Sequence, residues 1–276
     1  MATQCAGELT RHLPIRSRRV PATAVARKQA QRGLFSRMRK PVDGLVSRTI
    51  NRRISLAITG LFIDTSMTPN QMTIVANIIG AFGVYFTWQG TWGTLALGAF
   101  LVQMQSVLDG CDGEIARLKF QSSRMGEWLD NVLDDTVNVL YGLALGVASS
   151  KLLGSPVYTW LGIISVVCFT IYNAGLYTQL ALVHHTGNPF AFKWWYQTGP
   201  GDLGELLARP GLGNRILGFV RDLSRRDLFL FAFMLLAFLR LPQVATIWYT
   251  ALAVGYAAQM IVHLASGGLR VHARKA

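Results

Sequence analysis

Residues 108–135, LDGCDGEIARLKFQSSRMGEWLDNVLDD, join two apolar segments that are each long enough to cross a bilayer. The whole chain has 14 acidic residues and a formal net charge of +13. Half of the acidic residues lie in this one stretch: Asp109, Asp112, Glu114, Glu127, Asp130, Asp134 and Asp135. A basic and apolar protein therefore gathers its carboxylates at the edge of a predicted membrane span.

The composition indicates a polytopic membrane protein. Of the 276 residues, 51% are hydrophobic and 15% are charged, whereas soluble domains carry about 25% charged residues. The three cysteines, Cys5, Cys111 and Cys168, are far apart and odd in number, which indicates neither a disulfide framework nor a Cys-x-x-Cys metal site. We attribute the positive charge to membrane topology and anionic lipid, and expect no nucleic-acid partner.

Three regions follow from the distribution of charge. Residues 1–41 form a basic tail that we predict to be disordered and cytoplasmic, 42–268 a membrane domain, and 269–276 a second basic cytoplasmic tail. Between 42 and 63, apolar residues recur at helical spacing with arginines among them, which favours a helix lying along the membrane surface. An Arg-rich, acid-poor N-terminus also fits an organellar transit peptide, which stays an alternative.

The fold class that the sequence predicts is an all-α polytopic membrane protein, with six transmembrane helices preceded by an amphipathic juxtamembrane helix. The spans are placed at 72–89, 93–118, 124–149, 156–182, 227–240 and 243–266, and the fifth is short for a crossing that needs roughly 20 residues. With the N-terminus inside, 25 of the 27 Lys and Arg residues lie on the inner side. This bias predicts a multi-pass protein with both termini cytoplasmic. A bacterial inner membrane is the default compartment, and an organellar membrane the alternative.

The spacing of four aspartates predicts one shared site. If the second and third spans form an antiparallel hairpin turning near Gln121, Asp112 and Asp130 lie at matched depth, because a helix rises 1.5 Å per residue. Asp109 and Asp134 match in the same way. The four side chains then fall on facing arcs of the two helices, whereas Glu114 and Asp135 project away and are secondary.

Such a cluster needs a counter-charge, since unpaired carboxylates at membrane depth are costly. Protonation, or pairing with Arg117 and Arg124, would reduce the cost. A pair of hard divalent cations, Mg²⁺ or Mn²⁺, is the better solution. Two metals about 4 Å apart suit phosphoryl transfer. Gly110, Gly113 and Ala116 would let a ligand approach closely, although small residues also serve helix packing.

The full pattern, Asp109-x2-Asp112-Gly113-x2-Ala116-Arg117-x8-Gly126-x3-Asp130-x3-Asp134, resembles the complete signature of the CDP-alcohol phosphotransferases, also called CDP-alcohol phosphatidyltransferases. Residues 68–73, TPNQMT, resemble the start of that family's first helix. The resemblance covers roughly residues 42–268, leaving the N-terminal tail outside.

This resemblance implies an integral membrane enzyme, commonly a homodimer, that transfers a substituted phosphate from a CDP-alcohol to an acceptor alcohol and releases CMP. By the motif, four aspartates ligate two divalent metals and the last is also the general base: Asp109, Asp112, Asp130 and Asp134. Gly113 and Ala116 would line the cytidine site, and Arg117 would hold the nucleotide end.

The sequence leaves the two alcohols open. We expect CDP-diacylglycerol as the donor, in phospholipid biosynthesis, with membrane lipid as a partner. The alternative is a CDP-polyol donor joined to a second polar alcohol, for example an inositol phosphate. Arg225 and Arg226, just before the fifth span, are candidates for binding an acceptor phosphate, and Arg221 is a weaker one. Each of the three also suits a plain membrane anchor.

Two other classes of protein use acidic residues inside a membrane. An Asp-rich intramembrane prenyltransferase needs a second Asp-rich motif and more spans. A cation transporter, the remote alternative, needs polar residues that continue to the outer side, and after Asp135 the third span has Asn138 and then almost wholly apolar residues. In the fourth span, four polar residues either line an acceptor cavity or form interhelical hydrogen bonds: Tyr172, Asn173, Tyr177 and Gln179.

Overall fold

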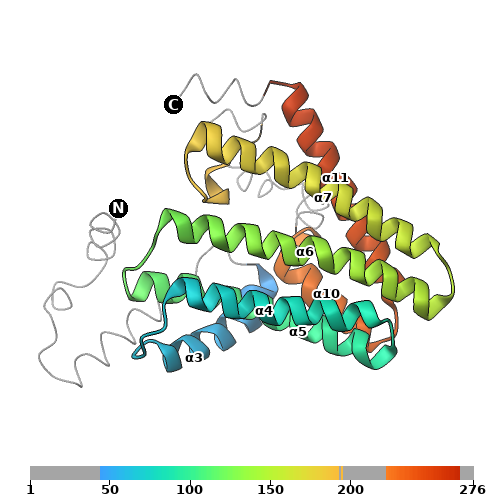
Figure 1. Ribbon diagram of the computed structural model, residues 1–276, viewed down its shortest axis with the longest axis horizontal. Coiled ribbons are helices and arrows are strands. Elements are labelled where there is room, and N and C mark those ends of the chain that lie inside the picture. Colours follow the sequence, from blue (N-terminus) through green and yellow to red (C-terminus); the bar gives the residue numbers. More distant parts are fainter. Residues whose placement is uncertain (1–43, 193, 195–221, 268–276) are drawn as a thin grey trace, which may run out of the picture.

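The computed structural model describes residues 44–192, 194 and 222–267, and this part of the chain is helical without a strand. The predicted tails, 1–41 and 269–276, lie outside the described residues. Figure 1 shows the helices in chain order: η2 (Ser47–Asn51), α3 (Arg52–Phe62), α4 (Pro69–Gln89), α5 (Trp92–Leu118), α6 (Arg124–Leu153), α7 (Val157–Gln179), η3 (Leu180–His184), η4 (Pro189–Ala191), α10 (Arg226–Phe238) and α11 (Pro242–Ala265).

Short polar signals fix where the long helices begin and end. At the start of α4, the Thr68 hydroxyl accepts a hydrogen bond from the Gln71 N–H, and the Gln71 side chain accepts one from the Thr68 N–H. Ser123 caps α6 by accepting from the Gly126 N–H. Gly90 ends α4 at a φ of 70°, a left-handed conformation that favours glycine. The hydrophobic pattern therefore located these helices to within a few residues.

Each of the six predicted spans corresponds to a helix of the structure, and the fifth is short. Among the described residues, five helices are long and apolar enough to cross a membrane: α4, α5, α6, α7 with its extension to His184, and α11. The fifth predicted span corresponds to α10, which has 13 residues. At 1.5 Å per residue it extends about 20 Å, less than the roughly 30 Å of a hydrocarbon core.

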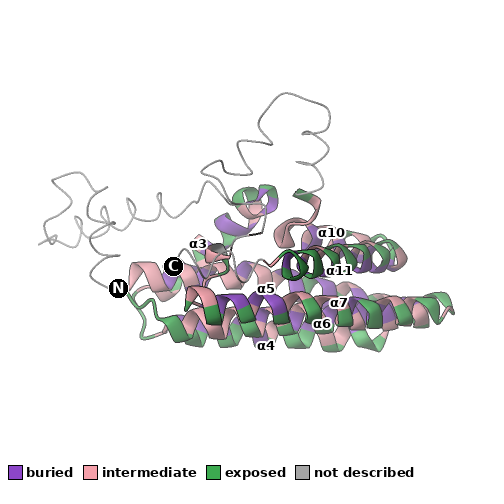
Figure 2. Cartoon of the chain, turned by 90° about the horizontal axis from the view of Figure 1, so that it is seen from above, coloured by how far each residue is buried: buried purple, intermediate pink, exposed green. Residues whose placement is uncertain are grey.

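The assumed pairing of the second and third spans is corrected. α4 packs on both α5 and α6, and direct contact between α5 and α6 is sparse. Figure 2 shows α10 and α11 on the opposite side of the bundle from α4 and α6. One core cluster joins α5, α6, α10 and α11, and its largest buried members include Leu95, Tyr141, Leu145, Phe233 and Tyr249. The aspartates of α5 and α6 thus converge around α4, not across a simple hairpin.

The juxtamembrane helix is present and is bound to α5 through a buried carboxylate. Glu114 is fully buried and accepts hydrogen bonds from Arg52 Nη1 at 2.8 Å, Ser55 Oγ at 2.7 Å and Thr59 Oγ1 at 2.7 Å. All three donors belong to α3. Glu114 therefore points away from the predicted site, as expected, and holds the surface helix in place.

This contact predicts a stability effect. Glu114→Ala removes the carboxylate that pairs with the buried Arg52 guanidinium, and breaking a buried ion pair costs about 3–5 kcal/mol. We expect a clearly lower thermal unfolding temperature in detergent, measured by intrinsic fluorescence.

A double-mutant cycle provides the control. Arg52→Ala combined with Glu114→Ala should lose less stability than the sum of the single variants, because both single changes remove the same ion pair. Additive losses would show that the two side chains do not interact.

Candidate active site

Three of the predicted metal ligands meet in space. One carboxylate oxygen from each of Asp109, Asp112 and Asp130 lies within 4.8 Å of the other two. α5 supplies the first two residues and α6 the third. Asp112 is 6% exposed and accepts a hydrogen bond from Thr73 Oγ1 at 2.5 Å. Oδ1 of Asp130 is buried without a hydrogen-bond partner among the described residues. A partly buried oxygen cluster with an unsatisfied acceptor fits a hard divalent cation.

The fourth predicted ligand, Asp134, is bound differently. It lies one helical turn beyond Asp130 and is 4% exposed, yet it falls outside the group of three. Its Oδ1 accepts from Gln105 Nε2 at 2.7 Å and from Asn77 Nδ2 at 3.3 Å. Its Oδ2 accepts from Arg226 Nη1 at 2.6 Å. A carboxylate at this depth requires a counter-charge, and α10 supplies it.

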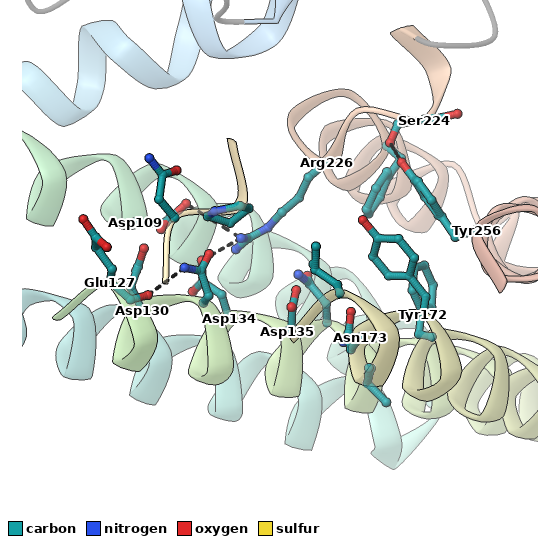
Figure 3. A pocket seen from close by; sticks show the side chains of 18 of the residues that line it. Asp109, Glu127, Asp130, Asp134, Asp135, Tyr172, Asn173, Ser224, Arg226 and Tyr256 are labelled. Carbon is teal, nitrogen blue, oxygen red and sulfur yellow. Dashed lines mark hydrogen bonds and ion pairs between the residues drawn. The ribbon is translucent and has the colours of Figure 1, made fainter. Parts of the chain in front are cut away.

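Of the three candidate arginines, Arg226 reaches the site. Figure 3 shows its side chain extending from the start of α10 toward Asp109 and Asp134. Its Nη1 is 3.8 Å from Asp109 Oδ2, and its Nη2 donates to Gln105 Oε1 at 3.3 Å. Arg225 pairs instead with Asp227 at 3.4 Å. Arg221 lies outside the described residues. Arg225 and Arg226 are adjacent in the sequence, so the position at which α10 begins determines which side chain points toward the aspartates.

Two cavities meet at the aspartates. The smaller, about 170 Å³, lies against the starts of α4 and α6 and is lined by the three residues predicted for the nucleotide, Gly113, Ala116 and Arg117. Gly126 allows the close approach here, since an added Cβ would stand 2.9 Å from Asn70 Oδ1. The larger cavity, about 670 Å³, extends toward α7, α10 and α11. Both cavities are bordered by Arg117, Glu127 and Asp130.

Polar side chains line the larger cavity beyond Asp134. Asp135, expected to be secondary, lies on its wall and accepts a hydrogen bond from the Tyr177 hydroxyl. This corrects the sequence interpretation, which considered only two helices and could not foresee a wall made by α7. Of the four polar residues of the fourth span, two line the cavity and two form hydrogen bonds with other helices. Tyr172 and Asn173 line the cavity, whereas Tyr177 binds α6 and Gln179 pairs with His263 at 2.6 Å.

Sequence reasoning missed three side chains that hold the aspartates. Thr73 and Asn77 belong to α4, and Gln105 lies one turn before Asp109 on α5. Each is a polar residue within a predicted span or at its edge, where such residues face another helix or a cavity. That signal was available, but their partners could not be assigned without the packing of α4.

The hydrogen bond from Thr73 predicts an effect on metal affinity. Thr73→Val removes the donor to Asp112 while keeping the side-chain shape, and loss of a group that supports a metal ligand typically weakens metal binding by about 10–100-fold. Thr73→Ser should retain binding. The measurement is Mn²⁺ binding to purified protein, followed by electron paramagnetic resonance of the free ion.

Thr87→Val is the matched control. Thr87 is a fully buried threonine on the same helix, and its hydroxyl binds the Gly83 carbonyl far from the aspartates. Equal Mn²⁺ affinity in the Thr73→Val, Thr87→Val and unaltered proteins would contradict a role of Thr73 at the metal site.

Comparison with known proteins supports this reading of the aspartates. The sequence profile of the CDP-alcohol phosphatidyltransferase family matches residues 66–205. "Bifunctional IPC transferase and DIPP synthase" of Aquifex aeolicus is 38% identical over 105 residues, covering 38% of this chain and 23% of that protein. The protein of the same name from Rubrobacter xylanophilus is 41% identical over 130 residues, covering 46% of this chain and 29% of the relative. "Archaetidylinositol phosphate synthase" of Pyrococcus horikoshii is 35% identical over 86 residues, covering 29% and 42%.

The matched segments thus take up less than half of the length of each of these relatives. The family profile, in contrast, spans half of this chain, and its range contains the whole aspartate motif and the helices α4 to α7 that surround it. The apolar helices agree with a multi-pass membrane protein. The chain therefore belongs to the CDP-alcohol phosphatidyltransferase family.

Proposed function

We propose that this chain is a membrane enzyme that transfers a substituted phosphate group from a CDP-alcohol to an acceptor alcohol with release of CMP. We further propose that the acceptor is a phosphorylated polyol of the inositol-phosphate type, and that the donor is a CDP-linked polar alcohol. The observation that carries the proposal is the position of Arg226, whose guanidinium lies in the larger cavity beside Asp134. The names of the relatives favour the same class, since one of them is an archaetidylinositol phosphate synthase. The initial expectation of CDP-diacylglycerol becomes the second candidate.

Arg226 suits an acceptor phosphate because its donors are only partly used. Nη1 and Nη2 bind Asp134 and Gln105, and Nε is buried without a partner among the described residues. A guanidinium presents several donors in one plane and binds phosphate oxygens in pairs. A phosphate in the cavity would therefore satisfy a donor that otherwise stays unpaired at a cost in free energy.

The donor is proposed to occupy the smaller cavity, with its cytidine near Gly113 and Ala116 and its phosphates near Arg117. Arg117 borders both cavities. Its charge would hold the nucleotide end, so that the diphosphate extends toward Asp130 and meets the acceptor there. This arrangement brings the two substrates together from opposite sides of the aspartate cluster, and such positioning supplies a large part of the acceleration of phosphoryl transfer.

Asp109, Asp112 and Asp130 would hold divalent cations, Mg²⁺ or Mn²⁺, with Asp134 as the ligand that completes a two-ion site. When bound, the ions would neutralise charge on the diphosphate and on the departing CMP. Asp134 would also accept the proton of the attacking hydroxyl. The acceptor oxygen then bonds to the phosphorus that carries the donor alcohol, and the bond from that phosphorus to the CMP oxygen breaks.

The second candidate keeps the same acceptor but uses a lipid-linked donor. The name of the Pyrococcus relative, which refers to an archaetidyl product, favours it. We further propose a homodimer with both termini in the cytoplasm and a bacterial inner membrane as the compartment. The topology counts α10 as a short sixth crossing and rests on the 25 of 27 Lys and Arg residues that then fall on one side.

The direct test is release of CMP by purified protein in detergent with Mg²⁺ or Mn²⁺. Two donors, CDP-inositol and CDP-diacylglycerol, are each combined with inositol 1-phosphate, inositol, glycerol 3-phosphate and serine. We expect metal-dependent release that is fastest with CDP-inositol and inositol 1-phosphate. Preference for CDP-diacylglycerol would establish the second candidate, and use of unphosphorylated alcohols alone would refute the acceptor proposal.

Arg226→Lys tests the phosphate contact. Lysine keeps the charge but loses the planar pair of donors, so we expect KM for inositol 1-phosphate to rise by about 10–100-fold, as the loss of a hydrogen bond to a charged group predicts. KM for the CDP-alcohol should change little. Arg225→Lys is the matched control, because that neighbour pairs with Asp227. Equal acceptor KM values in the two variants would argue against Arg226.

The base assignment is tested at Asp134. Asp134→Asn keeps the shape but cannot accept the proton, and general-base catalysis contributes about 10²–10⁴-fold. We expect turnover to fall by that factor while metal-dependent binding of the CDP-alcohol partly persists. Asp112→Asn should weaken both turnover and binding. Near-normal turnover of Asp134→Asn would mean that another group takes the proton.

A further inference from the structure

The larger cavity continues past the reacting groups. Figure 3 shows Asp109, Asp130 and Asp134 at one end, and Asp135, Asn173 and Tyr172 beyond them. The general reaction requires only the first group. On the sequence, Asn138 follows Asp134 by one helical turn, which is about 6 Å along the axis of α6, and it also lines the cavity. The polar side chains that line the larger cavity beyond Asp134 therefore need a role other than phosphoryl transfer.

We propose that Asn138, Asn173 and Asp135 form a subsite that recognises the free hydroxyl groups of a polyol acceptor. This inference rests on the proposed function and adds to it the residues that select the acceptor. It places the attacking hydroxyl near Asp134 and the rest of the polyol ring against α6 and α7.

The two asparagine side chains of this subsite lack internal hydrogen-bond partners among the described residues. Oδ1 of Asn138 is buried without a hydrogen-bond partner among the described residues. The Asn173 side chain makes no hydrogen bond within the same part of the chain. Buried amides are normally paired, and an unpaired one costs about 1–3 kcal/mol. A ligand that both donates and accepts hydrogen bonds, as a hydroxyl does, would satisfy an amide from either side.

Three tyrosine hydroxyls near the asparagines already donate hydrogen bonds to other groups of the cavity wall. The Tyr249 hydroxyl donates to the Asn138 carbonyl at 2.6 Å, and the Tyr256 hydroxyl donates to the Ser224 carbonyl at 2.9 Å. The Tyr177 hydroxyl shares its one proton between Asp135 and the Asn131 carbonyl, which both lie within hydrogen-bond distance. These bonds hold the wall in place. They leave the asparagine amides, and the second carboxylate oxygen of Asp135, to face a ligand.

Aromatic rings form part of the wall of the larger cavity. Phe169 lies 5.0 Å from Tyr249 and 6.0 Å from Tyr256 between ring centroids, and Tyr172 lies 5.0 Å from Tyr256. All four rings line the cavity. Aromatic faces are apolar with a slightly negative surface, which suits the C–H face of a cyclic polyol. Aromatic walls with a few converging polar groups are typical of a specific small-molecule site.

The chemistry therefore favours a ring with several hydroxyls over a short or singly substituted acceptor. Glycerol 3-phosphate carries the same phosphate for Arg226 but offers fewer hydroxyls. A site built to bind hydroxyls discriminates strongly against analogues that lack them, because its polar groups then remain unpaired.

Asn138→Leu and Asn173→Ala test the subsite by the ratio of kcat/KM for inositol 1-phosphate to that for glycerol 3-phosphate. Each variant should lower this ratio by at least about tenfold, the value of one or two lost hydrogen bonds. Dissociation constants of inositol 1-phosphate, measured by ligand-dependent thermal stability, should rise in parallel. Asn173→Ala removes a side chain that makes no internal hydrogen bond, so it stays informative if Asn138→Leu folds poorly.

Thr136→Val is the control on the same helix, since Thr136 is exposed and its hydroxyl binds the Val132 carbonyl. It should leave the ratio unchanged. If the unaltered enzyme uses inositol 1-phosphate and both asparagine variants keep its selectivity, the subsite is refuted while the proposed function stands. If the unaltered enzyme uses no phosphorylated polyol, both proposals fall together.

Discussion

The central constraint on this structure is the burial of several carboxylates at membrane depth. An isolated carboxylate transferred to a medium of low dielectric loses most of its hydration energy, and proteins compensate with counter-charges and hydrogen bonds. Here each neighbouring helix contributes at least one side chain that donates a hydrogen bond to an aspartate. α4 gives Thr73 and Asn77, α5 gives Gln105, and α10 gives Arg226. The packing of four helices is thus tied to a single electrostatic requirement, and the two cavities arise on either side of it.

The surface helix is connected to the same centre at two points. Glu114 lies two residues after Asp112 on α5 and is held by α3. Asp227 follows Arg226 on α10, and its Oδ2 accepts a hydrogen bond from the Ser47 N–H at 2.8 Å, at the start of η2. The segment from Ser47 to Phe62 therefore contacts both helices that bring charge to the site. This segment thereby fixes the relative position of α5 and α10.

Much of this could be predicted from the sequence, and the exceptions share a physical cause. Hydrophobic periodicity and capping residues locate helices because they act within one helix, and the spacing of the aspartates places Asp109, Asp112 and Asp130 together because helical rise is constant. The partner of Asp134, the wall position of Asp135 and the choice of Arg226 over Arg225 depend on contacts between helices distant in sequence. Those contacts leave no periodic signal. The shortness of the fifth span was visible in the sequence, and α10 ends at Phe238.

The measurement that tests this account most directly is ³¹P nuclear magnetic resonance of the reaction product formed from CDP-inositol and inositol 1-phosphate. If the larger cavity binds a phosphorylated polyol through Arg226, the product carries one phosphodiester and one phosphomonoester, and two resonances of equal intensity grow as CMP appears. A product with a phosphodiester alone, formed from added inositol while inositol 1-phosphate remains unconsumed, would contradict the account.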